Sequence, residues 1–292
     1  MIAAALDWGS SSLRAYRFDE AGQCVQTDAR DAGIKFVSED GFEDVFRELT
    51  SAWTRTGDRV LLSGMITSRN GWIESDYLPC PLPLTQLLDA GTRLALDGLD
   101  LVFLPGARQD APADVMRGEE LQLLGASSVY GDGVYITPGT HSKWARITSG
   151  VLEQFRTIPT GEVFDVLIKH SLIGALTSDG NWDEAAFLAG VERGNQLDSV
   201  LSDLFTTRSG VLLQQYSEAF AYAWLSGLLI GREIREGLAT LGDQGARLTL
   251  IGSAPLCANY LKALSYLQLD AHAAEHDVTL SGYQQIIAHV TT

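Results

Sequence analysis

The stretch DWGSSSLRAYRFD, residues 7–19, follows directly on the short apolar run IAAAL at residues 2–6. A continuous apolar run of this length is typical of a buried strand, and the alternation over residues 12–18 predicts a half-buried strand after it. An aspartate, a glycine and three serines stand where the first strand passes into the second. Glycine lets backbone N–H groups approach an anion, and hydroxyls donate to phosphate oxygens. The turn is therefore a candidate phosphate-binding turn.

Two later stretches share this pattern of a strand that ends in a glycine turn with hydroxyls. They are TPGTHSK at residues 137–143 and IGSAP at residues 251–255. Each turn alone is a weak signal, because a strand followed by Gly-Ser is common in α/β proteins. Three such turns in this order favour a site that binds a phosphorylated ligand.

Length and composition indicate a globular protein that is large enough for two domains. The chain has 292 residues, of which 46% are hydrophobic and 20% are charged, as in ordinary α/β enzymes. Acidic residues outnumber basic residues 37 to 21, which gives a net charge of −16. Because no stretch gathers enough Lys and Arg to bind a phosphate backbone, nucleic acid is not an expected partner. An anionic small molecule would need a local basic pocket to overcome the general repulsion.

The cysteines and the N-terminus favour a soluble, cytoplasmic protein. Cys24, Cys80 and Cys257 are far apart, odd in number and without CxxC spacing, which favours packing roles over a disulfide framework or a zinc site. No positively charged segment precedes the first apolar run, and no stretch approaches the ~18 consecutive apolar residues of a membrane span. We therefore expect no membrane partner.

The two halves of the chain are expected to be built alike, although they show no close sequence repeat. Each half opens with a three-stranded meander, which carries its glycine turn between the first two strands. Residues 64–84 are dense in glycine, proline and polar residues, and are interpreted as a binding loop, with a purely structural excursion as the alternative. The expected strands are 2–6, 12–18, 22–27, 59–65, 99–106, 247–255 and 267–271, with three more within 133–157. The expected helices are 42–53, 256–267 and 278–290, with others up to about residue 239.

Several blocks of the sequence together resemble one family. DWGSSSLRAY, GMITSRNGW with YLPCP, DVMRGEELQLLG, PGTHSKW and PTGEVFDVLIKHSLIG resemble, block by block and over most of the chain, the 2-dehydro-3-deoxygalactonokinases. These belong to the sugar kinase/actin/chaperone ATPase superfamily. The resemblance implies an α/β fold of two ribonuclease H-like (actin-like ATPase) domains with a nucleotide cleft between them. We place the N-terminal domain with the sugar-binding loop at residues 1–113, and the C-terminal domain with the second phosphate and adenosine motifs at residues 114–292.

The resemblance also implies roles for the three turns, with ATP and Mg²⁺ as the cofactors. Asp7 would hold Mg²⁺, because a hard cation that bridges phosphates prefers carboxylate oxygen; the alternative is an aspartate that caps a turn. The turns at residues 7–12 and 137–143 would bind phosphate. The turn at residues 251–255 would contact adenine and ribose; the alternative is a turn without a ligand. The phosphate contacts would come from Gly9, Ser10, Ser11, Ser12, Gly139, Thr140, His141 and Lys143, and the adenosine contacts from Gly252 and Ser253.

The catalytic base is left open among three carboxylates of the block DVMRGEELQLLG. Related sugar kinases place an aspartate here, and Gly118-Glu119 matches their Gly-Asp pattern with glutamate in place of aspartate. Glutamate can perform the same proton transfer with a slightly withdrawn backbone. We rank Glu119 first, Asp114 second and Glu120 third; the alternative is that the acidic pair only begins a helix, where its charge favours the helix dipole.

A substrate that carries a carboxylate requires a cationic partner, and arginine suits two-pronged recognition of that group. Arg69 lies in the expected binding loop, and Arg14 and Arg117 each lie within a family block. Trp72 belongs to the same loop block, where it either lines the substrate site or packs the wall of the cleft.

The function implied by the resemblance is ATP-dependent phosphorylation of 2-dehydro-3-deoxy-D-galactonate at its C6 hydroxyl, in galactonate catabolism. Two alternatives stay open: a kinase for another sugar acid or sugar, and a non-catalytic, sugar-responsive ATP-binding module. The expected partner is a small sugar acid, and a homodimer is the assembly considered.

Overall fold

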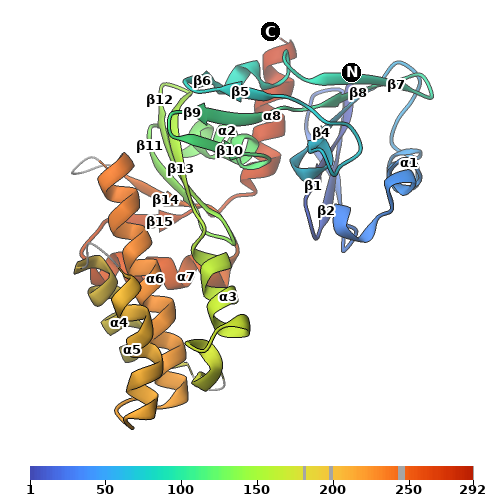
Figure 1. Cartoon of the computed structure of the whole chain (residues 1–292). Helices are drawn as coiled ribbons and strands as arrows, with labels where there is room; N and C mark the ends of the chain where they lie inside the picture. Colours follow the sequence, from blue (N-terminus) through green and yellow to red (C-terminus); the bar gives the residue numbers. More distant parts are fainter. Residues whose placement is uncertain (180–181, 197–199, 243–246, 292) are drawn as a thin grey trace. The chain divides into compact units, whose positions relative to one another are not determined.

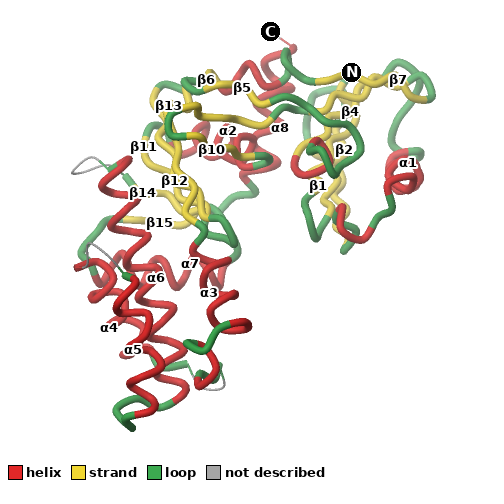
Figure 2. The backbone as a smooth tube through the Cα atoms, in the orientation of Figure 1, coloured by secondary structure: helices red, strands yellow, loops and turns green. Residues whose placement is uncertain are grey.

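A computed structural model of the chain describes residues 1–179, 182–196, 200–242 and 247–291. The fold is mixed α/β (Figures 1 and 2), as the sequence predicted. The backbone forms two compact units: unit 1 comprises residues 1–132, 147–154 and 275–292, and unit 2 comprises residues 133–146 and 155–274. The expected domain boundary between residues 113 and 114 stays a prediction.

Unit 1 is built on a six-stranded sheet with the order β3-β2-β1-β4-β8-β7. The first three strands form the antiparallel meander, β1, β4 and β8 run parallel, and β7 is an antiparallel edge strand. Buried residues of β1, β4 and β8, with one face of the first helix, make the core of this sheet. The strands are β1 (Ile2–Trp8), β2 (Leu13–Phe18), β3 (Cys24–Arg30), β4 (Arg59–Ser63), β7 (Thr92–Leu96) and β8 (Leu99–Phe103).

Unit 1 also contains a small three-stranded sheet, β10-β9-β5, and three helices. Two of the helices, α2 and α8, are close because Gly125 and Gly282 lie where they meet; a Cβ on Gly125 would stand 1.8 Å from the Val278 carbonyl oxygen. The remaining elements of unit 1 are α1 (Phe42–Thr50), β5 (Tyr77–Pro79), β6 (Leu82–Pro83), β9 (Gly106–Asp110), β10 (Ala113–Met116), α2 (Glu119–Tyr130) and α8 (Val278–Thr291). Short 3-10 turns lie at Ile34–Phe36, Glu39–Gly41, Gly64–Thr67 and Leu84–Leu87.

Unit 2 repeats the strand order of unit 1 in the sequence β13-β12-β11-β14-β15. Strands β11, β14 and β15 run parallel, and β12 and β13 each continue into unit 1, where β13 pairs with β6. The elements are β11 (Gly133–Thr137), β12 (Ser142–Thr148), β13 (Val151–Ile158), α3 (Thr160–His170), a 3-10 turn (Gly174–Leu176), α4 (Glu184–Gln196), α5 (Leu201–Leu212), α6 (Glu218–Leu241), β14 (Leu248–Leu250), α7 (Ala254–Tyr266) and β15 (Ala271–Ala273).

Most expected elements are present, and four regions differ; one of them is β7, because no strand was expected at residues 92–96. The expected binding loop 64–84 contains a 3-10 turn and the short strands β5 and β6. The hairpin β9–β10 was not expected, because its polar residues carry little alternation of apolar side chains. The strand expected at residues 267–271 was misplaced: Leu267 ends α7, Gln268 has a φ of 59°, and the strand is Ala271–Ala273. Among the described residues, no helix has both the length and the apolar character to cross a membrane.

Helices α4 and α6 pack backbone against backbone through glycines spaced four residues apart. Figure 1 shows these helices side by side in unit 2. A Cβ on Gly190 or Gly194 of α4 would stand 2.3 Å or 2.1 Å from a carbonyl oxygen of α6. A Cβ on Gly227 or Gly231 of α6 would stand 2.0 Å or 2.2 Å from a carbonyl oxygen of α4. Any side chain here would force the two helices apart.

We therefore predict that Gly227→Ala destabilises the protein, although alanine is the better helix former. Overpacking of a core contact costs about 1–3 kcal/mol, so the melting temperature should fall by several degrees in a thermal unfolding scan. Ser226→Ala is the matched control, because it alters the next position on α6 without adding an atom. Equal melting temperatures for Gly227→Ala and wild type would contradict the close contact.

Candidate functional site

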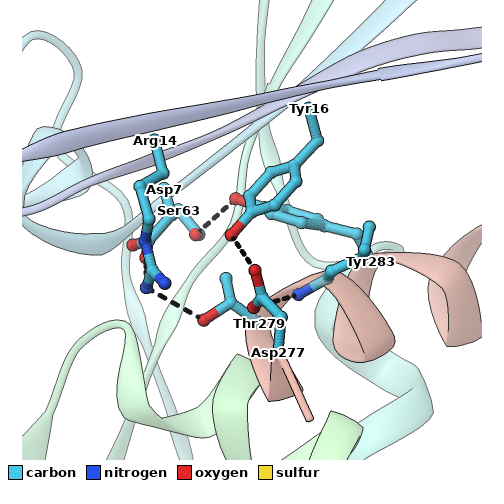
Figure 3. Close-up of polar contacts among 8 residues, drawn as sticks. Asp7, Arg14, Tyr16, Ser63, Asp277, Thr279 and Tyr283 are labelled. Carbon is cyan, nitrogen blue, oxygen red and sulfur yellow. Dashed lines mark hydrogen bonds and ion pairs between the residues drawn. The ribbon is translucent and has the colours of Figure 1, made fainter. Parts of the chain in front are cut away.

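The carboxylate of Asp7 lies at the end of β1 and is paired with Arg14 of β2 (Figure 3). The strand register places the two residues opposite each other, and Arg14 donates to Asp7 Oδ2 at 2.7 Å. The Asp7 side chain is 16% exposed and the Arg14 side chain is 42% exposed. A short meander turn therefore fixes an ion pair, between a largely buried carboxylate and a part-exposed arginine, at the position where the sequence predicted the phosphate turn to begin.

Residues of the C-terminal segment complete this cluster. Figure 3 shows Arg14 reaching Thr279 Oγ1, which accepts at 3.2 Å, and Tyr16 donating to Asp277 Oδ2 at 3.0 Å. Beside them, the hydroxyls of Ser63 and Tyr283 are 2.6 Å apart. Sequence reasoning missed these contacts because more than 200 residues separate the partners along the chain and no motif marks them.

The charges around Asp7 oppose one another. Burial raises the pKa of Asp7, Arg14 lowers it by charge and hydrogen bonding, and the negative charges of Asp277 and Glu119 raise it further. A cation bound at Asp7 would relieve the repulsion between this carboxylate and the charges of Asp277 and Glu119. The arrangement suits a metal ion that arrives with a ligand.

The turn Gly9–Ser12 is held from behind by the backbone of residues 33–35. Gly9 N–H donates to the Ser12 carbonyl at 2.9 Å, and Ile34 and Lys35 donate to the carbonyls of Gly9 and Ser10. A Cβ on Gly33 would stand 2.3 Å from the backbone of Ser11. Within the described part of the chain, no hydrogen bond takes up the hydroxyls of the predicted phosphate contacts, which are Ser10, Ser11 and Ser12.

Of the three candidate bases, Glu119 is near enough to Asp7 for its charge to act on the Asp7 carboxylate. Its carboxylate accepts from Arg117 N–H at 3.1 Å and is among the charges that raise the pKa of Asp7. Asp114 lies on β10 of the small sheet, where its carboxylate accepts from Val115 N–H. Glu120 is 1% exposed, and both of its carboxylate oxygens accept from Gly118 N–H at 2.8 Å. The geometry therefore places Glu119 near the metal-binding candidate and Glu120 inside the protein.

Two glycines bring α2 up to Asp7. Gly118 has a φ of 103° and Gly64 a φ of 86°, and a Cβ on Gly118 would stand 3.2 Å from Gly64 Cα. A Cβ on Gly64 would stand 3.2 Å from Asp7 Oδ1. Both conformations are costly for residues with a side chain. The acidic pair at the start of α2 therefore depends on glycine at both positions.

Burial raises the pKa of Glu120 to about 8, and the charge of Glu119 adds to the rise. Between the unfolded value of 4.5 and this raised value, the folded protein keeps a proton that the unfolded chain has released. Stability contributed by this group is therefore lost as the pH rises through that window.

We predict that Glu120→Gln becomes more stable relative to wild type between about pH 5 and about pH 9, measured by denaturant unfolding at each pH. The exposed substitution Glu39→Gln is the control, and parallel pH profiles for Glu120→Gln and wild type would contradict the raised pKa.

The predicted binding loop is held by Arg117. Its guanidinium donates to Thr67 Oγ1 at 2.6 Å, to the Ser75 carbonyl at 2.8 Å and to the Tyr77 hydroxyl at 3.3 Å. It also lies 4.1 Å from the centre of the Tyr77 ring, as in a cation–π contact. These contacts give Arg117 a structural task in shaping the loop, and a substrate contact by it stays a prediction.

The other two predicted loop residues lie in different environments. Arg69 is exposed, at the turn that follows the 3-10 segment, and is available to an anionic ligand. Trp72 packs its ring against Phe46 and Phe103 in the core of unit 1. The packing alternative is therefore observed for Trp72, and its role in binding substrate stays a prediction.

In unit 2, the second phosphate turn and the adenosine turn follow adjacent parallel strands. Strand β11 leads into Gly139 and β14 leads into Gly252, and the two strands pair along their length. A Cβ on Gly252 would stand 3.5 Å from the Pro138 carbonyl oxygen, whereas one on Gly139 would meet nothing within 4 Å. Gly252 and Ser253 are exposed, with Ser253 at the start of α7. Ligands of α/β proteins bind at such carboxyl ends of parallel strands, and both turns present open backbone there.

The side chains of the second turn are partly engaged within unit 2. Thr140 and His141 are exposed, and His141 Nε2 lies 2.7 Å from Glu162 Oε2 of α3. Lys143 is 5% exposed, and its Nζ donates to the His141 carbonyl at 3.2 Å. Lys143 therefore braces the turn from inside, while Gly139 and Thr140 form its open part.

Comparisons with known proteins agree with one another. A family model described as 2-keto-3-deoxy-galactonokinase matches residues 7–286. The chain belongs to this family. The 2-dehydro-3-deoxygalactonokinase of Escherichia coli (strain K12) is 33% identical over 287 residues, with 98% of this chain and 97% of that protein covered. A Sinorhizobium meliloti protein of the same family, known from its crystal structure, is 32% identical with a TM-score of 0.90 and covers 99% of this chain and 98% of its own.

A more distant structure shares the fold alone. Component A of the (R)-2-hydroxyglutaryl-CoA dehydratase of Acidaminococcus fermentans is 12% identical with a TM-score of 0.54, over the full length of both chains. Because it belongs to this family, the chain is a carbohydrate kinase. Kinase activity implies that it uses ATP. The match from residue 7 to residue 286 includes every predicted site residue.

The site residues fit a nucleotide with a magnesium ion. No group of three or more His, Cys, Asp or Glu side chains able to hold a metal occurs among the described residues. Mg²⁺ in kinases is usually held by one or two carboxylates together with substrate phosphates and water, and not by a cage of protein ligands. Asp7, with Glu119 nearby, meets that requirement, and the glycine at position 64 leaves the space beside Asp7 Oδ1 clear.

Proposed function

We propose that the chain phosphorylates the C6 hydroxyl of 2-dehydro-3-deoxy-D-galactonate with ATP and Mg²⁺, in galactonate catabolism. The substrate is taken from the family whose model matches residues 7–286. The observation that carries the chemistry is the proximity of Asp7 and Glu119, since phosphoryl transfer requires a carboxylate for the metal and a base for the attacking hydroxyl.

Each residue group has a task in this proposal. Mg²⁺ held by Asp7 would supply neutralisation of phosphate charge. Glu119 would accept the proton of the attacking hydroxyl. The hydroxyls of Ser11 and Ser12, which are exposed, and of Ser10, which is half-buried, together with the backbone at Gly139 and Thr140, would bind phosphate oxygens in a net-acidic protein. Arg14 and Arg69 supply exposed guanidinium groups for the substrate carboxylate.

The strand order supports the finer fold proposal. Both β3-β2-β1-β4-β8 and β13-β12-β11-β14-β15 place a meander next to parallel strands. We propose that each is a ribonuclease H-like sheet, with the first phosphate turn in one and the second phosphate and adenosine turns in the other. The nucleotide cleft between two such domains, which the family resemblance implies, stays part of this proposal.

The proposal is tested by coupled ADP release with ATP and Mg²⁺ against a panel of acceptors. The panel contains 2-dehydro-3-deoxygalactonate, its gluconate epimer, glycerol and common hexoses. We expect strong stimulation by the galactonate compound. If only another acceptor stimulates ADP release, that acceptor is the substrate in place of the galactonate compound. If the protein binds ATP and no acceptor stimulates ADP release, the non-catalytic, sugar-responsive module is favoured.

The choice of base gives a sharper prediction. We expect Glu119→Gln to lower kcat by ~10²-fold or more, because removal of a general base costs that much. Asp114→Asn is the matched control, with a carboxylate removed five residues earlier, and it should retain most of the activity. A large loss of kcat confined to Asp114→Asn would transfer the role of base to Asp114.

A further inference from the structure

A buried carboxylate lies in unit 2, outside every motif that the sequence analysis selected. Glu233 on α6 is 1% exposed. Its Oε1 accepts from Trp144 Nε1 at 3.0 Å, and its Oε2 accepts from the Tyr260 hydroxyl at 2.6 Å. Burial raises the pKa of Glu233, and hydrogen bonding by Thr160, Tyr260, Trp144 and Ser142 lowers it. Four side chains from three different elements, β12, α3 and α7, therefore converge on one carboxylate of α6.

This arrangement is costly unless every bond is made. A carboxylate in a protein interior must be compensated for lost hydration, and none of the ion pairs among the described residues includes Glu233. Its compensation comes from neutral donors, and a carboxylate has enough lone pairs to accept from all four. An apolar residue at this position would avoid the desolvation cost. A carboxylate here therefore indicates that the fold requires a hydrogen-bond acceptor at this position.

Each of the four residues around Glu233 belongs to the second phosphate turn, contacts it, or is next in sequence to a residue that does. The Ser142 hydroxyl is 3.2 Å from the Tyr260 hydroxyl, and Ser142 Oγ accepts from Gly139 N–H at 3.4 Å. With the protons of Tyr260 and Ser142 turned toward Glu233, a lone pair of Ser142 Oγ remains to accept from Gly139. The acceptor on α6 thus sets the direction of a bond inside the turn.

A second path reaches the same turn through α3. Thr160 is the first residue of α3, and a Cβ on its neighbour Gly161 would stand 2.4 Å from the Gly139 carbonyl oxygen. Glu162 N–H donates to the Thr140 carbonyl at 3.0 Å. The hydrogen bond from Thr160 to Glu233 therefore fixes the start of the helix that supports the back of the turn.

Trp144 makes the third connection. It lies on β12 directly after the turn, and its indole ring is buried. The ring packs where Gly237 of α6, one helical turn beyond Glu233, leaves room for it: a Cβ on Gly237 would stand 2.2 Å from the ring. Helix α6 thus offers both a space for the indole and an acceptor for its N–H.

We propose that Glu233 is a positioning residue for the nucleotide, which holds the turn Gly139–Ser142 in the conformation that receives phosphate. The proposal rests on the proposed function, since it assigns the turn to ATP. Glu233 acts through Ser142, Thr160 and Trp144 and does not itself touch the ligand. A fixed turn binds phosphate more tightly because no ordering of the backbone is needed at the moment of binding.

The test is Glu233→Gln, which preserves size and replaces one acceptor oxygen by an amide NH₂ donor. With the NH₂ toward Trp144 the bond to the indole is lost, and with the NH₂ toward Tyr260 the tyrosine hydroxyl must accept and turns its own proton elsewhere, so the network is disturbed in either orientation. We expect the Kd for ATP, measured by calorimetry without acceptor, and the KM for ATP to rise by about 10-fold or more. The KM for the sugar acid should stay near the wild-type value, a split that a general loss of stability would not produce.

Two further variants make the test independent of folding. Tyr260→Phe removes the donor to Glu233 Oε2 and the contact of that hydroxyl with Ser142, and it keeps Trp144, so it should raise the same two constants. It decides the test if Glu233→Gln does not fold. Ile234→Val is the control, because it alters the next buried position on α6 and lies in the apolar core; it should leave the Kd for ATP unchanged.

The outcomes separate the two proposals. A wild-type protein that does not bind ATP would overturn the proposed function. A wild type that binds ATP, with Glu233→Gln and Tyr260→Phe folded and unchanged in Kd, would overturn the positioning role alone. Equal rises in the KM values for ATP and sugar acid would also overturn it.

Discussion

Burial of Asp7 at the end of β1 is the constraint on which the first site depends. A carboxylate that is 16% exposed loses much of its hydration, and two other carboxylates act on it electrostatically. Arg14 offsets part of this cost, since the antiparallel register sets the two side chains opposite each other. Thr279, from the other end of the chain, in turn holds Arg14. The meander and the C-terminal helix are thus joined at the group that we propose to bind the metal.

Glycine is used in both units where backbone must approach a site closely. Gly64 and Gly118 bring the start of α2 against Asp7, and Gly33 brings residues 33–35 against the serine turn. Gly161 does the same for α3 and the second turn. At each of these positions a single methyl group would collide with backbone or with the site carboxylate. The two turns are consequently shaped by what stands behind them as much as by their own residues.

The two units compensate buried acids in different ways. Near Asp7 an arginine and an exposed surface supply the compensation, so the carboxylate stays accessible to a cation. Glu233 is surrounded by hydroxyls and an indole N–H, with no ion pair among the described residues, and it is closed to solvent. Glu120 is intermediate, with a backbone N–H as its partner and a pKa raised to about 8 by burial. Burial and partner chemistry together separate a carboxylate that can meet a ligand from one that orders the chain.

The sequence by itself determined the mixed α/β class, the two meanders with their glycine turns and the family, because these depend on local periodicity and on contiguous blocks. It also brought Asp7, Gly139 and Gly252 forward as candidates, since a glycine turn after a buried strand is a local signal. Only the tertiary structure decided that the charge of Glu119 acts on Asp7, that Trp72 packs in the core, that Thr279 and Asp277 contact the first meander, and that Glu233 is buried. These facts depend on contacts between segments far apart in the chain, and burial acts on a charge only once the fold has brought those segments together.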